Sequence, residues 1–260
     1  AGEQRDYVAS RALLEESAAI DTELEDKWSV AVTLNAQAVI ERERGGLAES
    51  RQLFEENVAL WKELGDRAAV ARALSNLANV VNAQKDYVAA HALYEESLAI
   101  FNQLGDSSGV AWALDHQGDV AREQGDVAAA AVFYEKSLTA FRALGDRWGA
   151  ARALADLGNL ACTGDDFNRA RTLYDESLRL FVEPENRRGI AHLLECFACA
   201  AAGQGQAQRA LRLAGAAAAL RQALGVPQPR TEQARLELSL ASARERSEET
   251  TRATAWMEGW

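Results

Sequence analysis

The feature that most constrains this chain is a 40-residue period that runs without insertion or deletion from residue 1 to residue 226. The tripeptide Leu-Gly-Asp recurs at this spacing, at 64–66, 104–106 and 144–146. A strict period of this length indicates stacked copies of one supersecondary unit, each of which buries its apolar face against its neighbours.

Each period holds two stretches with apolar residues at helical spacing, which in the third full copy cover 107–123 and 127–144. Gly125 and Gly145 follow these stretches and suit the left-handed conformation that ends helices. Asp126 and Asp146 come next and are residues of the type that caps a following helix. The sequence LDHQGDVAREQGDV (114–127) is therefore largely turn and cap signal, and the chain is predicted to be all-α, built from helix hairpins.

Some positions of the repeat hold a small residue in every copy, and others hold a large one, as helices that pack closely require. We call the set of residues that recur at one position, 40 residues apart, a column. One small column is Ala38, Ala78, Gly118, Gly158 and Ala198, and the other is Ser10, Ser50, Ala90, Ala130, Ala170 and Ala210. The large columns are Leu14, Phe54, Tyr94, Tyr134 and Tyr174, and Asp21, Trp61, Phe101, Phe141 and Phe181. These residues are the predicted core.

The columns, with the pattern G-D-(Y/F)-x-x-A-x-x-(L/F)-(Y/F)-E-x-S-L, resemble tetratricopeptide repeats in a variant with a longer second helix. Residues 85–106, KDYVAAHALYEESLAIFNQLGD, are the clearest copy. The resemblance implies a right-handed α-solenoid of antiparallel hairpins. We expect the array to cover 1–226, with a first unit that lacks its first helix, and atypical capping helices over 227–260, because the continued register puts Leu238 and Met257 where small residues belong.

The resemblance also implies a concave groove lined by the first helix of each hairpin. The candidate groove residues are polar and of mixed charge: Asn35, Arg42, Arg72, Ser75, Asn76, Asn79, Asn82, Trp112, Asp115, His116, Asp119, Arg122, Arg152, Asp156, Asn159, His192 and Glu195. Asn76, Asn79 and Asn159 lie in columns where the family commonly uses asparagine to bind a peptide backbone. The expected ligand is a protein, a peptide or a small inducer.

Asp115, His116 and Asp119 could be read as a metal site. A metal needs donors that converge on one point, and adjacent helix residues diverge by about 100°. One helix is thus expected to supply at most two ligands, with Asp156 a possible third from the next repeat. The sequence favours recognition over metal binding here.

The cysteines provide an alternative hypothesis. His192, Cys196 and Cys199 share a helix face, and Cys162 belongs to the neighbouring repeat, so the four residues could form a zinc or redox site. A single C-x-x-C in an alanine-rich helix is a weak signal, because buried cysteine usually acts as a small hydrophobe. We expect neither a metal nor a cofactor.

Other activities lack a signature in this sequence. It contains no G-x-x-x-x-G-K-[ST], G-x-S-x-G or H-E-x-x-H motif, and its three histidines fall on separate repeats. The net charge of −11 argues against nucleic-acid binding, which needs clustered Lys and Arg. No apolar run is long enough to span a bilayer. We therefore expect a non-enzymatic protein of the cytoplasm, without nucleic-acid or membrane partners.

The C-terminal region RALRLAGAAAALRQALGVPQP (209–229) resembles the segment that closes the repeat region of large bacterial regulators. Those regulators carry a STAND-type signalling ATPase and sometimes a LuxR-type or SARP-type DNA-binding domain. Few lysines against many arginines suggest a bacterial source, and a chain whose one methionine is Met257 is expected to be a piece of something longer. We expect a sensor region flanked by other domains, with a self-associating scaffold as a second alternative.

Overall fold

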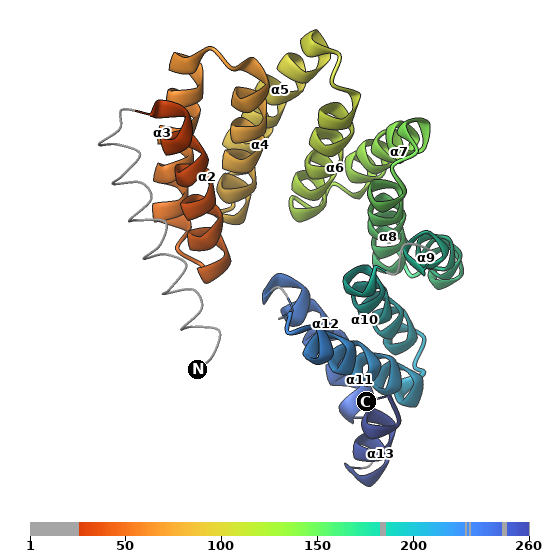
Figure 1. The fold of residues 1–260 in the computed structure, drawn as a ribbon. Coiled ribbons are helices and arrows are strands. Elements are labelled where there is room, and N and C mark those ends of the chain that lie inside the picture. Colours follow the sequence, from red (N-terminus) through yellow and green to blue (C-terminus); the bar gives the residue numbers. More distant parts are fainter. Residues whose placement is uncertain (1–25, 183–185, 227, 229, 246–248, 260) are drawn as a thin grey trace. The chain divides into compact units, whose positions relative to one another are not determined.

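The computed structural model describes residues 26–182, 186–226, 228, 230–245 and 249–259, and within these ranges it contains helices and no strand. The chain forms two compact units, 1–126 and 127–260. Unit 1 holds α2 Lys27–Arg44, α3 Leu47–Leu64, α4 Arg67–Ala83, α5 Tyr87–Leu104 and α6 Ser107–Glu123. Unit 2 holds α7 Val127–Leu144, α8 Arg147–Thr163, α9 Phe167–Val182, α10 Arg187–Gly203, α11 Ala207–Leu224, α12 Arg230–Glu245 and α13 Glu249–Gly259 (Figure 1).

Consecutive helices pair into hairpins, α2 with α3, α4 with α5, α8 with α9 and α10 with α11, which confirms the predicted α-solenoid of antiparallel hairpins. The turn signals explain the helix boundaries. Gly65 and Gly145 end α3 and α7 with φ of +73° and +70°, the left-handed region that glycine adopts readily. Asp66 and Asp146 then accept hydrogen bonds from backbone N–H groups of the next first turn, at 2.9 Å each.

The predicted core columns are buried from residue 38 onward, and their members Ser10, Leu14 and Asp21 lie outside the described residues. Tyr94, Tyr134 and Tyr174 are at most 1% exposed, and the small residues Ala38 and Ala78 are completely buried. Small size is required where helices meet these rings: a Cβ added at Gly158 would lie 2.4 Å from the Tyr174 ring. The small and aromatic columns therefore form one packing system within each hairpin.

A second use of glycine, which the sequence analysis did not identify, joins one hairpin to the next. A Cβ at Gly109 would lie 2.3 Å from the Phe101 ring, and one at Gly149 would lie 2.3 Å from Phe141. Gly189 meets the ring of Phe181 at 2.7 Å in the same way. Each phenylalanine lies near the end of the second helix of a hairpin, and its ring packs on a glycine near the start of the following helix, the first of the next hairpin. This contact fixes one hairpin against the next.

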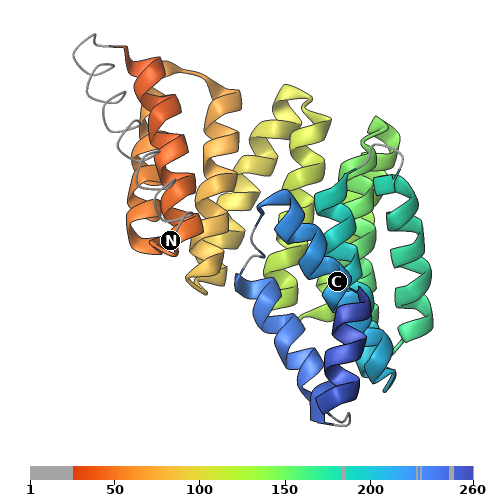
Figure 2. The same cartoon turned by 60° about the horizontal axis from the view of Figure 1, so that its bottom comes forward.

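The last two helices depart from the repeat. Helix α12 packs on α10 and α11, whereas α13 packs along α11 rather than pairing with α12 (Figure 2). Leu238 of α12, in the column where small residues meet the hairpin partner, is 80% exposed. The domain boundary after residue 226 remains a prediction, and the incomplete first unit over 3–24 lies outside the described residues. Among the described helices, none combines the length and apolar character needed to cross a bilayer.

Candidate functional site

In unit 1, the first helices α2 and α4 bring asparagine side chains together. The Asn76 amide donates to the Asn35 side-chain oxygen across the two helices at 3.0 Å, and both residues are partly exposed. Asn79, one turn further along α4, instead accepts a hydrogen bond from the Tyr94 hydroxyl at 2.8 Å. Asn35 and Asn76 therefore form a cross-helix amide pair, whereas Asn79 stabilises the core by binding the Tyr94 hydroxyl.

On α6, aromatic rings pack against Tyr94, the core tyrosine of the α4/α5 hairpin. The His116 ring stacks on Tyr94 with 5.9 Å between centroids, and the Trp112 ring lies 6.0 Å from His116. Flat rings of this kind offer apolar contact together with polar edges, as recognition surfaces commonly do. The face of α2, α4 and α6 thus combines amides with a short aromatic row.

The structure corrects one expectation about α6. Donor atoms of Asp115, His116 and Asp119 all lie within 4.8 Å of one another, although these residues come from a single helix. The prediction of at most two converging ligands was wrong, because side chains three and four residues apart are neighbours on a helix, and His116 Nδ1 lies 3.7 Å from the Asp119 carboxylate. The Arg122 guanidinium also lies 3.3 Å from Asp119 and already supplies positive charge.

Three further candidates of unit 1 differ in exposure. Arg72 on α4 is exposed, whereas Asn82 near the end of the same helix is only 9% exposed. Asn82 hydrogen-bonds the Glu123 carboxylate, and burial raises the pKa of that carboxyl above its usual value. Arg42 near the end of α2 is partly exposed.

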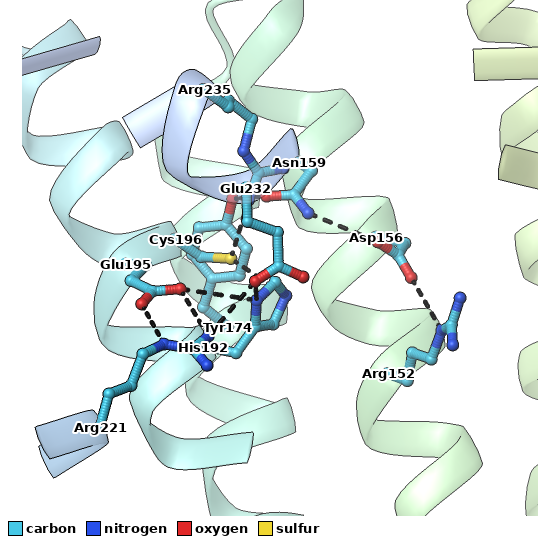
Figure 3. Close-up of polar contacts among 10 residues, drawn as sticks. All are labelled: Arg152, Asp156, Asn159, Tyr174, His192, Glu195, Cys196, Arg221, Glu232 and Arg235. Atoms are coloured by element: carbon cyan, nitrogen blue, oxygen red, sulfur yellow. Dashed lines mark hydrogen bonds and ion pairs between the residues drawn. The ribbon is translucent and has the colours of Figure 1, made fainter. Parts of the chain in front are cut away.

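In unit 2, the corresponding face of α8 carries Arg152, Asp156 and Asn159. The Arg152 guanidinium lies 3.7 Å from the Asp156 carboxylate, and the Asn159 amide donates to Asp156 at 3.5 Å (Figure 3). Asn159 also accepts a hydrogen bond from the Tyr174 hydroxyl at 2.9 Å, repeating the pair of Asn79 with Tyr94.

The adjoining face of α10 is built into a charged network. Glu195, 3% exposed, accepts two hydrogen bonds from Arg221 of α11, at 2.6 and 3.0 Å. The Glu232 carboxylate of α12 lies between His192 and Arg221, at 3.2 Å from the imidazole Nδ1 and 3.3 Å from the guanidinium (Figure 3). Three helices therefore meet through alternating charges.

The network changes the acidity of its members. Burial alone would lower the pKa of His192, but the Cys196 sulfur and the Glu232 carboxylate raise it well above 6.5. Burial alone would raise the pKa of Glu232, but the hydrogen bond from His192 and the charges of His192, Arg221 and Arg235 leave it below its usual 4.5. Both shifts favour the charged pair of His192 and Glu232.

The four residues of the zinc hypothesis do not converge. Among the described residues, no three of Cys162, His192, Cys196 and Cys199 bring donor atoms within 4.8 Å of one another. Cys196 Sγ lies 3.6 Å from His192 Nε2, and Cys162 Sγ lies 3.5 Å from the Tyr174 hydroxyl. Cys199 forms a hydrogen bond with Ser239. Burial raises the pKa of the Cys162 and Cys199 thiols, which keeps them protonated.

His192 converges instead with Glu195 and Glu232, whose donor atoms lie within 4.8 Å of its own. Two carboxylates and an imidazole could bind a divalent cation, but the Arg221 guanidinium lies between the carboxylates and already supplies the positive charge. The arrangement suits recognition of a carboxylate better than that of a metal.

Sequence reasoning identified His192 and Glu195 but missed Arg221, Glu232 and Arg235. A signal for Arg221 was present, because it falls in the column of Trp61, Phe101, Phe141 and Phe181 and replaces an aromatic residue by a charge. No comparable signal marked Glu232 and Arg235, since they lie beyond residue 226, where the repeat pattern ends.

Comparison with known proteins supports the repeat assignment. A tetratricopeptide repeat family model matches residues 29–103, 70–143 and 109–183. No curated protein gives a significant match. BtubC from P. vanneervenii has a similar structure, with a TM-score of 0.66, 18% identity and coverage of 86% of this chain and 95% of that one.

Two regulatory proteins also share the fold. The STAND protein with a tetratricopeptide repeat sensor from Pyrococcus horikoshii has a TM-score of 0.67 at 14% identity, and the match covers 96% of this chain and 40% of that protein. A Rap protein, in a complex with Competence and Sporulation Factor, has a TM-score of 0.67 at 14% identity, with 97% of this chain and 73% of that one covered.

Proposed function

This chain belongs to the tetratricopeptide repeat family, whose repeats serve as protein-interaction scaffolds, and we propose that it is the sensor region of a larger bacterial regulator. In this role it binds a protein or peptide partner through the first-helix faces of its hairpins and passes the signal to neighbouring domains. The family's repeats are typically non-enzymatic, in keeping with this role.

The observation that carries the proposal is the amide pair of Asn35 and Asn76 on the partly exposed face of α2 and α4. Side-chain amides offer both a donor and an acceptor, so they match the N–H and C=O groups of an extended or helical peptide. The aromatic row of Trp112 and His116 on α6 would supply apolar contact to the same partner.

Two structural relatives support a sensory role. One is a STAND protein whose repeats are described as a sensor, and the other is a Rap protein bound to Competence and Sporulation Factor. A similar fold thus occurs in a protein described as having a repeat sensor and in a protein that forms a complex with a factor. A bacterial source and a cytoplasmic location are part of the same proposal.

The test compares partner capture by the wild-type chain, an Asn35→Ala/Asn76→Ala variant and an Asn102→Ala control. Asn102 lies on α5, is exposed and donates only to the Leu98 carbonyl at 3.0 Å. A true partner should bind the double variant roughly tenfold more weakly in isothermal titration, as loss of one or two buried hydrogen bonds predicts, and bind the control normally. Equal affinity for all three proteins would remove the amide pair from the binding site.

A further inference from the structure

We call the contact at the end of a hairpin's second helix, where the next helix attaches, a joint. The joint that attaches α12 is chemically different from the other joints in unit 2. Phe141 and Phe181 are seated on Gly149 and Gly189, so those hairpins are joined by apolar packing. Forty residues after Phe181 the same column reaches Arg221, which bonds Glu195 of its own hairpin and Glu232 of α12. A charged, hydrogen-bonded joint thus replaces an aromatic one.

The donors at this joint are arranged for a carboxylate. His192 Nδ1 and the Arg221 guanidinium approach the same oxygen of Glu232, at 3.2 and 3.3 Å, from two different helices. Glu195 fixes Arg221 through two further hydrogen bonds, so the guanidinium is held in place independently of α12. Charge-assisted donors fixed in this way recognise an acidic side chain.

The remaining contacts of α12 within unit 2 lie on one side. Leu236 and Leu240 are buried in a cluster with alanines of α10 and α11, and Trp256 of α13 packs against the same cluster. The Arg235 guanidinium lies 3.7 Å from Cys196 Sγ. On the other side Leu238 is 80% exposed, because α13 packs along α11 instead. Removal of α12 would therefore leave the hairpins α8/α9 and α10/α11 paired.

We propose that α12 is a displaceable internal ligand of unit 2, whose Glu232 occupies a carboxylate-binding site formed by His192 and Arg221. An acidic helical segment of a partner protein takes that site when α12 leaves. The spacing on α12 defines this segment: a Glu or Asp followed by apolar residues four and eight positions later, as Leu236 and Leu240 follow Glu232. This proposal rests on the proposed role in partner binding, and it adds that α12 regulates access to the face of α10 and α11.

Cys196 is a natural reporter of the first step. It is completely buried, and Arg235 of α12 lies against its sulfur. Glu232→Gln removes the charge from the site and should speed modification of Cys196 by N-ethylmaleimide roughly tenfold, since a hydrogen bond to a charged group is lost and the labelling rate follows the open population. Peptide mass spectrometry identifies the modified cysteine.

The matched control is Glu237→Gln on the same helix, because Glu237 is exposed and pairs with Arg244 and, among the described residues, with no group of the joint. Cys196 in this control should react at the wild-type rate. Circular dichroism of Glu232→Gln should retain wild-type helicity, which separates release of α12 from general unfolding. A wild-type labelling rate for Cys196 in Glu232→Gln would overturn the proposal.

The second step is tested with a fluorescein-labelled peptide of the α12 sequence, 230–245, and a peptide with glutamine at the position of Glu232. In fluorescence anisotropy, the 260-residue chain with Glu232→Gln should bind the glutamate peptide at least tenfold more tightly than the glutamine peptide, again on the loss of a charged hydrogen bond. Equal affinities, or binding of neither peptide, would refute the carboxylate site.

These measurements are independent of the amide pair in unit 1. They use no natural partner, and the Asn35→Ala/Asn76→Ala variant should behave as wild type in both. Failure of the labelling and peptide experiments would therefore leave the proposed sensor role intact, whereas failure of partner capture would not affect them.

Discussion

The buried ion pair of Glu195 and Arg221 makes a quantitative prediction about stability. The two side chains are 3% and 9% exposed, and two hydrogen bonds of 2.6 and 3.0 Å connect them. Arg221→Met keeps much of the side-chain volume but leaves the Glu195 carboxylate buried, with His192 Nδ1 at 3.9 Å as its nearest cationic group.

Unit charges about 4 Å apart attract by about 4 kcal/mol at an effective dielectric constant near 20. Removing one member of such a pair typically costs about 3–5 kcal/mol, because the other stays buried without compensation. We expect Arg221→Met to lower the free energy of unfolding by this amount. With an m-value of about 3 kcal/mol/M, the urea midpoint of unit 2 should fall by about 1 M or more.

Urea unfolding followed by circular dichroism at 222 nm measures this change. The matched control is Arg212→Met on the same helix, whose ion pair with Glu258 is half exposed on both sides and should contribute less than about 1 kcal/mol. A double variant, Glu195→Leu with Arg221→Met, should recover to within about 2 kcal/mol of wild type, since apolar residues commonly replace buried ion pairs without loss. Equal midpoints for Arg221→Met and Arg212→Met would refute the reasoning.

Three further changes test the packing and the charges. Gly149→Ala places a Cβ 2.3 Å from the Phe141 ring and should cost about 1–3 kcal/mol in urea unfolding, whereas Gly164→Ala, with no atom closer than 3.7 Å, should cost little. Tyr174→Phe removes the hydroxyl that donates to Asn159 and contacts Cys162, and should cost about 1 kcal/mol. The pKa of His192 is raised in the folded state, so its stabilisation is fully present below about pH 6.5 and lost as the pH rises through the raised value. Thermal melting from pH 6 to pH 10 should therefore show the advantage of wild type over His192→Gln shrinking towards alkaline pH.

The helices of the array could be predicted from the sequence almost to the residue. The stretches 107–123 and 127–144 were expected and are α6 and α7. This accuracy comes from repetition: a glycine or aspartate that recurs every 40 residues is a far stronger boundary signal than one that occurs once. Helices α12 and α13 were expected only as an atypical cap, because outside the period single residues had to be read without that support.

The candidate site was harder to predict because asparagines on the first helices of the hairpins have different hydrogen-bond partners in the structure. Asn76 pairs with Asn35 across helices, whereas Asn79 and Asn159 bond the Tyr94 and Tyr174 hydroxyls. Column position specifies where a side chain begins but not which polar group it reaches, since that depends on neighbours from other repeats. The four residues of the zinc hypothesis lie apart for the same reason: helix spacing placed His192 and Cys196 together, but the other two thiols have partners of their own.

Departures from a repeat column carry information that the column itself cannot. Phe101, Phe141 and Phe181 obey the pattern and are explained by packing on glycine. Arg221 breaks the pattern at a buried position, where an unpaired guanidinium would be costly, so the structure must supply acidic partners there. It supplies Glu195 and Glu232, and Glu232 belongs to a helix with one face exposed in unit 2. Among the described residues of unit 2, the joint at Arg221 relies on charge where the joints at Phe141 and Phe181 rely on an aromatic ring, and it is therefore the joint that an acidic partner is best suited to open.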